Sequence, residues 1–412
     1  MSNVAAYKKH THREHILELP DTYIGSIDTH SDERWVWDEG AGRMNWTTVE
    51  FCPGFYKLFD EVLVNALDHR VRLMGSKAAD VQPLKNIWVT IDSTRITVRN
   101  DGDGIPVGTH PEYGMHVPEM IFGHLLTSSN YDKTEEKIVG GKNGYGAKLA
   151  NIFSKEFVVE TCDHRAGKKY KQVWSDNMTK CEKPVLSKGT AKPYTEISYV
   201  PDLGRFHWST GADGAAKDGE SKAPSSIPDD MIKVMCSRVM DAAACAGKEC
   251  KVHLNGKLLG VNTFQKYVGL YTNEDERATA DSDGDKKRLI AYEKCGDRWE
   301  VAAVLTRSLH GDSVPDERHI SFVNGIYTRR GGKHVEYITK TVLADFCEVA
   351  KKKAKLDVTT GMLKDSVVFF INSTITNPAF DTQTKETLTT PMSKWGSKPE
   401  ISGKFCDQLI KA

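Results

Sequence analysis

The most constraining feature of the sequence is a glycine-rich stretch that runs directly into a mostly apolar segment, residues 149–153. Inside a helix each glycine would cost about 1 kcal/mol relative to Ala, so the stretch is better interpreted as a loop that feeds a helix. Such a loop points N–H groups and the positive end of the helix dipole at one place, where a phosphate is stabilised. A simple turn between two core elements is the alternative that this pattern leaves open. The stretch consists of Gly141, Lys142, Asn143, Gly144, Tyr145, Gly146, Ala147 and Lys148.

Two common phosphate-binding motifs do not fit this stretch. A Walker loop, G-x-x-x-x-G-K-[S/T], matches the span from Gly141 to Gly146, but Ala147 stands where the lysine is needed. A dinucleotide fingerprint, G-x-G-x-x-G, fails because Leu149 occupies the place of the third glycine. The chain therefore carries G-x-x-G-x-G with a lysine behind it, and the neighbouring segments have to decide its function.

The composition is that of a globular protein with more than one domain. The 412 residues can form two or three full cores, and 39% hydrophobic with 27% charged residues is ordinary. The 56 basic residues balance the 56 acidic ones, so nucleic acid could bind only through a local patch. The nine cysteines form no C-x-x-C pair, which favours reduced thiols in an intracellular compartment over disulfides or a zinc site. No long apolar run or secretory signal is present, so no membrane partner is expected.

An amphipathic helix is predicted over residues 55–70, because apolar residues recur there at helical spacing. Glu61, Asn65 and Asp68 lie at i, i+4 and i+7 and therefore share one stripe on another face. A polar stripe is usually solvated. This one is an acid, an amide and an acid between apolar neighbours, which is unusual for a face that only meets water.

Two strands and a glycine-rich turn are predicted after this helix. Residues 87–91 and 96–98 have strand character, and the sequence Asn-Asp-Gly-Asp-Gly-Ile-Pro at 100–106 ends the second strand. Taken alone, this turn supports nothing more than a tight loop. Further on, the hydroxyl and amide cluster at 127–131 precedes a charged run, 132–137, and such a segment can cap phosphates with neutral donors.

The rest of the chain predicts more strands and helices, interrupted by two low-complexity loops. Residues 209–226 and 273–287 lack periodicity and are expected to be flexible. The acidic run 281–285 lacks the Gly and Glu of a calcium loop, so a solvated loop is the preferred interpretation. Strands are expected at 156–161, 195–199, 299–306, 320–323 and 367–371, and helices at 230–244 and 335–354.

The order of these segments resembles the ATP site of the superfamily of gyrases, heat-shock chaperones, histidine kinases and mismatch-repair proteins. Within it, nearly the whole chain is similar to the N-terminal ATPase region of eukaryotic type IIA DNA topoisomerases. Asn100 stands where gyrases usually carry Asp, but its amide oxygen can still accept a hydrogen bond from the adenine amino group. The matching segments are 61–66 (Glu-Val-Leu-Val-Asn-Ala), 126–131 (Leu-Thr-Ser-Ser-Asn-Tyr), 141–148 and 383–385 (Gln-Thr-Lys).

The resemblance implies an α+β fold with two domains. The first would be a two-layer sandwich ATPase domain at 27–262, with the flexible insertion at about 209–226. The second would be an α+β transducer domain with a ribosomal-protein-like fold at 263–412. Residues 1–26 would be an arm exchanged between two subunits; it is so polar that it is expected to lie on another surface rather than fold alone.

Residue by residue, the resemblance implies a site for ATP and Mg²⁺. Glu61 would be the general base acting on the attacking water, and Asn65 would bind Mg²⁺ through its amide oxygen, the kind of ligand that this ion prefers. Lys385 would reach the γ-phosphate from the transducer domain. Asn100 would lie beside the adenine, and Tyr23 from the arm of a second subunit would seal that pocket. The other implied ATP-binding residues are Ser128, Ser129, Asn130, Gly141, Lys142, Asn143, Gly144, Tyr145, Gly146, Ala147, Lys148, Gln383 and Thr384.

The resemblance also implies partners. The chain would be the ATP-driven gate of an enzyme that passes one DNA duplex through another, would form a homodimer on binding ATP, and would need a C-terminal DNA-cleavage core that this sequence lacks. Lys351, Lys352 and Lys353 form a basic cluster that would face double-stranded DNA, although a helix C-terminus favours cations by itself. A nuclear location is expected, with mitochondria as the alternative. A chaperone-type clamp and a phosphotransferase are the rival functions, and no phosphoacceptor-helix His motif supports the second.

Overall fold

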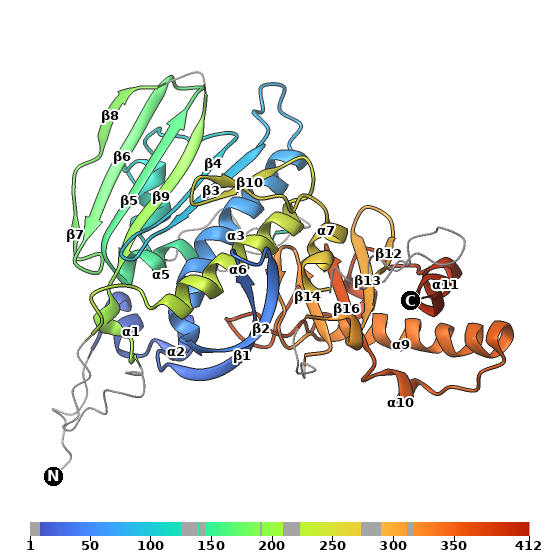
Figure 1. Cartoon of the computed structure of the whole chain (residues 1–412). Helices are drawn as coiled ribbons and strands as arrows, with labels where there is room; N and C mark the ends of the chain where they lie inside the picture. The colour runs from blue at the N-terminus through green and yellow to red at the C-terminus, as the bar shows by residue number, and fades with distance from the viewer. Residues whose placement is uncertain are drawn as a thin grey trace, which may run out of the picture.

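The computed structural model describes residues 9–125, 138–139, 145–189, 192–208, 223–272, 290–310 and 317–411 (Figure 1). These residues form a two-stranded hairpin, a nine-stranded sheet and a five-stranded sheet, together with helices that pack on them. The predicted α+β fold is confirmed. Among the described residues, no helix is long and apolar enough to cross a membrane.

Helix α3, Pro53–Gly75, is the central helix of the first domain. A proline in its first turn loses no hydrogen bond, because the first N–H groups of a helix have no partner inside it. The helix packs against α5 (Gly146–Ile152), α6 (Asp229–Ala246) and the sheet. As a result, Glu61 is only 5% exposed and Asp68 only 2%. The two acids of the polar stripe predicted on this helix are therefore buried, and Asn65 between them is half-buried.

The nine-stranded sheet forms the second layer of this domain, with α3, α5 and α6 packed on its strands. Its strand order is β11-β10-β3-β4-β9-β5-β6-β7, and β8 also pairs with β6. The strands predicted at 87–91, 96–98, 156–161 and 195–199 are confirmed as β3, β4, β5 and β9. The bounds are β3 Asn86–Ile91, β4 Ile96–Asp101, β5 Ser154–Asp163, β6 Lys168–Ser175, β7 Lys180–Cys181, β8 Val185–Lys188, β9 Tyr194–Pro201, β10 Lys251–Leu254 and β11 Lys257–Leu258.

The second domain is built on the five-stranded sheet, in the order β12-β13-β16-β14-β15. Helix α9, Lys333–Val349, continues into a π-helical turn, Ala350–Ala354, and the C-terminal helix α11, Gly403–Lys411, packs against α9 and β12 (Figure 1). The strands and the helix predicted in this part are confirmed. The strand bounds are β12 Ile290–Lys294, β13 Trp299–Leu305, β14 His319–Val323, β15 Ile326–Tyr327 and β16 Val367–Ser373, and α10 is Thr360–Leu363.

One hydrophobic core crosses from the first domain to the second. The ring of Trp35, in the first domain, lies 5.0 Å from that of Tyr271 in the second, and the ring of Tyr271 lies 5.0 Å from that of Phe370. Helix α7, Phe264–Val268, carries the crossing, since it packs against α6 on one side and against β12 and β13 on the other. The boundary expected between residues 262 and 263 stays a prediction, because the core continues across it.

The described part of the N-terminal arm folds against its own chain. It forms α1, His12–Glu18, and α2, Asp21–Ile24, and Ile16 and Ile24 are both fully buried. A capping box between Thr11 and Glu14 begins α1 and satisfies its first N–H groups. Two buried isoleucines therefore anchor an otherwise polar segment. The exchange of the arm between subunits stays a prediction.

Candidate active site

Glu61 is the centre of the candidate site, halfway along α3. Its Oε1 atom accepts a hydrogen bond from Lys385 Nζ at 3.1 Å and pairs with Lys57 Nζ at 2.7 Å. None of these three side chains is more than 8% exposed, so water screens their charges weakly. Sequence reasoning singled out Glu61 and Lys385 but missed Lys57. Its spacing of one helical turn from Glu61 was the available signal.

The second carboxylate oxygen of Glu61 faces the start of α5. A Cβ atom at Gly146, the first residue of that helix, would lie only 2.2 Å from Glu61 Oε2. A side chain at this position would displace the Glu61 carboxylate, so glycine here allows the carboxylate and the helix terminus to come together. The close approach explains the last glycine of the glycine-rich stretch.

The charges around Glu61 set its protonation. Burial by itself would raise the pKa of the carboxyl, but Lys385 and Lys57 outweigh this effect and hold the pKa at about 2. Glu61 is therefore ionised at neutral pH and, in this arrangement, a weak proton acceptor. Moving Lys385 away from the carboxylate would raise the pKa and make Glu61 a stronger base.

Lys385 comes from a loop of the second domain. Its backbone has a φ of 64°, a left-handed conformation that residues other than glycine seldom adopt. The neighbouring Thr384 lies against the arm, since its Cγ2 atom is 3.1 Å from the Cβ position of Gly25. Gln383 is half-buried beside it. The arm, the loop and α3 thus meet around Glu61.

Asn100, the last residue but one of β4, is 6% exposed. Its Nδ2 atom donates to the backbone oxygen of Asp101 at 2.7 Å, which leaves the amide oxygen to act as the acceptor. The Asp101 carboxylate is already committed, because it accepts bonds from Lys85 N, Asn86 N and Asn86 Nδ2. Of Asn100 and Asp101, Asn100 is therefore the residue with a side-chain oxygen suited to accept a hydrogen bond from an adenine ring.

The backbone around Asn100 is shaped by close packing. A Cβ atom at Gly104 would lie 2.0 Å from the backbone oxygen of Cys162, so the turn after β4 requires glycine there. Thr195 of β9 pairs in register with Asn100, and its hydroxyl lies 3.1 Å from that of Thr161. Sequence reasoning did not single out Thr195, because only the sheet register brings it beside Asn100.

The structure also describes three neighbours of Gly146 in the glycine-rich stretch: Tyr145, Ala147 and Lys148. Lys148 is 3% exposed, and burial lowers its pKa to about 8. An anion close to this amine would favour its charged form. Ala147 is buried in α5. Tyr145 contacts Tyr23 of the arm, with ring centroids 6.1 Å apart, so Tyr23 lies against its own chain in this structure.

The structure brings only part of the predicted set together. Glu61, Gly146 and Lys385 meet directly, and half-buried Asn65 lies one helical turn after Glu61. The basic cluster lies elsewhere, at the end of α9, where Lys351, Lys352 and Lys353 pair with Asp357, Glu348 and Asp407. Seven predicted residues lie outside the described part of the chain: Ser128, Ser129, Asn130, Gly141, Lys142, Asn143 and Gly144.

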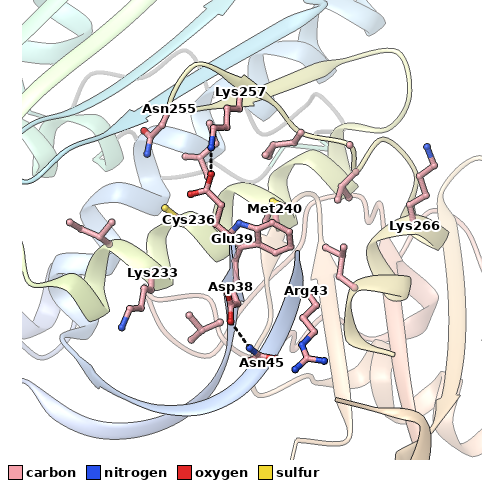
Figure 2. A pocket seen from close by; sticks show the side chains of 18 of the residues that line it. Asp38, Glu39, Arg43, Asn45, Lys233, Cys236, Met240, Asn255, Lys257 and Lys266 are labelled. Atoms are coloured by element: carbon pink, nitrogen blue, oxygen red, sulfur yellow. Dashed lines mark hydrogen bonds and ion pairs between the residues drawn. The ribbon is translucent and has the colours of Figure 1, made fainter. Parts of the chain in front are cut away.

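A separate open hollow of about 1350 Å³ lies beside α6 and the hairpin of β1 (His30–Asp38) and β2 (Arg43–Phe51) (Figure 2). Lys257 pairs with Glu39 there, and Asn45 donates to Asp38 at 2.9 Å. None of the residues around Glu61 lines this hollow. It is therefore distinct from the candidate active site.

Comparisons with protein families agree with this arrangement. Residues 53–175 match the family of histidine kinase-, DNA gyrase B- and HSP90-like ATPases, and residues 264–412 match DNA gyrase B. DNA topoisomerase 2 of Saccharomyces cerevisiae is 40% identical and that of Arabidopsis thaliana 41% identical, each over 98% of this chain. The chain spans only 27% and 25% of the length of these two relatives.

Solved structures of topoisomerase II ATPase regions match this chain over almost their whole length. The ATPase region of Saccharomyces cerevisiae topoisomerase II is 39% identical with a TM-score of 0.84, and the match covers 100% of this chain and 97% of that one. The ATPase and transducer domains of Balamuthia mandrillaris DNA topoisomerase II are 38% identical with a TM-score of 0.83, covering 100% and 96%. The 43K ATPase domain of Thermus thermophilus gyrase B, at 20% identity and a TM-score of 0.54, shares the fold. The chain therefore belongs to the family of the ATPase regions of eukaryotic type II DNA topoisomerases.

Proposed function

We propose that this chain binds and hydrolyses ATP and serves as the ATP-driven gate of a longer type II DNA topoisomerase. The observation that carries the proposal is the contact between Glu61 and Lys385, a buried carboxylate of the first domain 3.1 Å from an ammonium group of the second. A nucleotide bound at this point would contact both domains. Its hydrolysis would therefore change the interaction between them.

The proposed chemistry assigns one task to each side chain. Glu61 Oε2, which faces the start of α5, would orient the attacking water and take its proton, an effect worth about 10²–10⁴ in rate. Lys385 would leave Glu61 and place its charge on the γ-phosphate. This movement would raise the pKa of Glu61 when a base is needed, because one of the two charges that lower this pKa is withdrawn. The helix terminus at Gly146 and buried Lys148 would face the phosphates.

Mg²⁺ would bind at the same site through one protein ligand, the amide oxygen of Asn65. Within the described residues, no group of three or more His, Cys, Asp and Glu side chains could hold a metal ion. The other ligands would then be phosphate oxygens and waters, which is the usual coordination of Mg²⁺ bound with a nucleotide. The ion would neutralise phosphate charge. Ser128, Ser129 and Asn130 would add neutral donors to the phosphates.

The second domain favours a topoisomerase over a chaperone-type clamp, because residues 264–412 match DNA gyrase B. The proposed partners are double-stranded DNA, a second copy of the chain and the C-terminal DNA-cleavage core of the same polypeptide. A nuclear location belongs to the same proposal, with mitochondria as the alternative.

DNA is expected to stimulate ATP hydrolysis by this chain, whereas an unfolded client protein should not. Replacing Lys351, Lys352 and Lys353 by Ala should reduce the stimulation and flatten its salt dependence, because each lost phosphate contact removes about one unit from the log–log slope. The three existing ion pairs are exposed and can open at little cost. Steady-state ATPase assays over a salt series measure both effects.

Basal hydrolysis without DNA is the internal control, and it should survive the triple substitution. Equal stimulation and an equal salt slope in the variant would show that the lysines only complement the helix end. Stimulation by client protein alone would favour the chaperone-type clamp.

ATP binding is expected to convert the chain from monomer to dimer. In the described structure the arm lies on its own chain, with Tyr23 beside Tyr145 and Gly25 against Thr384. In a dimer the arm would occupy the same position on the other subunit, and the movement of Lys385 toward the nucleotide would disturb its present contact. A non-hydrolysable ATP analogue with Mg²⁺ should therefore trap dimers, and ADP should do so less well.

Light scattering during size-exclusion chromatography measures the oligomeric state. A chain that stays monomeric with saturating analogue would contradict the arm exchange. So would a chain without residues 1–26 that dimerises as well as the complete one.

A further inference from the structure

Lys57 is a buried cation that the proposed mechanism has not used. It is 3% exposed and lies one turn before Glu61 on α3. Its Nζ atom is 2.7 Å from Glu61 Oε1 and 3.6 Å from Asp60 Oδ2. Burial would lower the pKa of this amine, but the charges of Glu61 and Asp60 outweigh that effect and raise it, so Lys57 stays protonated at neutral pH. Burying an ammonium group is costly unless it is paired, so Lys57 is stable at this position only because Glu61 and Asp60 pair with it.

We propose that Lys57 is a positioning residue that holds the Glu61 carboxylate in place and keeps it ionised after Lys385 has moved to the nucleotide. The inference rests on the proposed ATP hydrolysis. Lys57 and Lys385 bind the same oxygen, Oε1, and Oε2 is thereby left facing Gly146. Lys57 belongs to the same helix as Glu61, whereas Lys385 belongs to a loop of the second domain. Only Lys57 can therefore remain on Oε1 when the loop moves.

The surrounding charges hold Lys57 in place beside Glu61. Asp60 also pairs with Arg238, whose Nε atom is 2.7 Å from Asp60 Oδ1, and Arg238 is 1% exposed. Arg238 in turn donates to the backbone oxygen of Gly325 in the second domain at 2.6 Å. After Lys385 leaves, Lys57 is the cation that remains on Glu61, while Arg238 is shared between Asp60 and Asp241. If Lys57 were absent and Lys385 had moved to the nucleotide, no described cation would remain paired with the Glu61 carboxylate.

No other described charge contacts Glu61. On α6, Arg238 is committed to Asp60 and lies 4.0 Å from Asp241. The cations that lower the pKa of this carboxylate are Lys385, on the loop of the second domain, and Lys57, on α3 itself. The elements packed against α3 also carry Asp229, Asp230 and Lys233 on α6, Asp21 on α2, Lys148 on α5, and Arg99 and Asp101 on β4.

The test compares Lys57→Met with Lys57→Arg in steady-state ATP hydrolysis between about pH 5 and pH 9. In Lys57→Met the midpoint of the acidic limb of kcat should rise by about 1–3 pH units, because a nearby opposite charge has been removed from the base. KM for ATP should change by less than about threefold. Lys57→Arg should return the limb toward its original position, since the positive charge is restored. Lys233→Met is the matched control: Lys233 pairs with Asp230 at 3.1 Å, but its side chain is 55% exposed.

An acidic limb that does not move in Lys57→Met would overturn the inference, and so would a loss of rate that is uniform at all pH values. If the unaltered chain hydrolyses no ATP, the proposed function itself fails. If it hydrolyses ATP and the limb stays in place, only the role of Lys57 fails.

A second measurement does not depend on the folding of Lys57→Met. Infrared difference spectra of the unaltered chain with a non-hydrolysable ATP analogue at about pH 5 report the carboxylic acid C=O band, and Glu61→Gln identifies the contribution of Glu61. Absence of a Glu61 band would show that the carboxylate stays ionised beside Lys57, as expected. A Glu61 band that vanishes in Glu61→Gln would show protonation and would overturn the inference.

Discussion

Replacing Glu61 by Gln is expected to abolish most ATP hydrolysis while nucleotide binding is retained. The amide has the shape of the carboxylate and can still accept hydrogen bonds from Lys57 and Lys385, but it cannot take a proton from water. Loss of a general base typically lowers the rate by about 10²–10⁴. The side chain faces α5 across a contact that needs glycine at Gly146, and Gln preserves this fit. Calorimetric nucleotide binding and steady-state turnover on one preparation measure the two effects.

Glu156→Gln provides a matched control. Glu156 also pairs with a cation, Arg95 at 2.6 Å, but this pair lies at the surface with the carboxylate side chain 44% exposed. Its neutralisation should leave turnover unchanged, because exposed pairs contribute little. A Glu61→Gln chain that retains turnover within about fivefold of the unaltered chain would be incompatible with a general base worth 10²–10⁴.

The second large effect is expected for Lys385→Ala, which should lower kcat far more than ATP affinity. One charge-assisted contact is worth about 1.5–3 kcal/mol, or roughly 10-fold to 150-fold in rate at 1.36 kcal/mol for each factor of ten. The contact would be strongest on the charge that develops in the transition state, so the loss should appear in kcat. A change confined to ATP affinity would contradict the role of Lys385, and unchanged kinetics would remove Lys385 from the site.

The pH dependence separates this role from an effect on Glu61. In the chain without nucleotide, removing Lys385 takes away a charge that lowers the pKa of Glu61, so that pKa should rise and the acidic limb of kcat/KM should move to higher pH. The acidic limb of kcat should move little, because Lys385 has already left Glu61 when nucleotide is bound. The Nζ atom of Lys57 remains 2.7 Å from Glu61 Oε1. At pH values well above the midpoint of either limb, the carboxylate therefore stays ionised. The loss of rate should therefore persist at about pH 8 and above. Recovery of the full rate at high pH would mean that Lys385 acts only through the ionisation of Glu61.

The sequence predicted most elements of the fold because their hydrophobic periods are clear. The helix expected at 55–70 is the core of α3, and the strand expected at 195–199 is β9. The burial of Glu61 could be suspected from its apolar neighbours. The contact between Glu61 and Lys385 could not be derived from local pattern, because 324 residues separate them and only the family resemblance connected them.

Other features needed the tertiary structure. Lys57 and Arg238 look like ordinary surface cations of amphipathic helices, and only the packing of α3 against α6 buries both beside Asp60. The arm was predicted to be too polar to fold alone and to lie on another surface, but the residues that anchor it, Ile16 and Ile24, are identified only by their complete burial in the structure. Single apolar residues at wide spacing produce no periodic signal, and their burial depends on the surface that receives them.

The core that crosses between the two domains has a mechanical consequence. The rings of Trp35 and Tyr271 pack against each other across the junction, and closely packed interiors resist deformation. A wide hinge opening there would expose the apolar surface, whereas a small sliding motion would keep it covered. Displacements generated by hydrolysis should therefore be carried by the polar contacts that can break and re-form, such as those of Arg329 with Asp32 and of Lys385 with Glu61. The second domain would then move as a rigid body that pivots about the shared core.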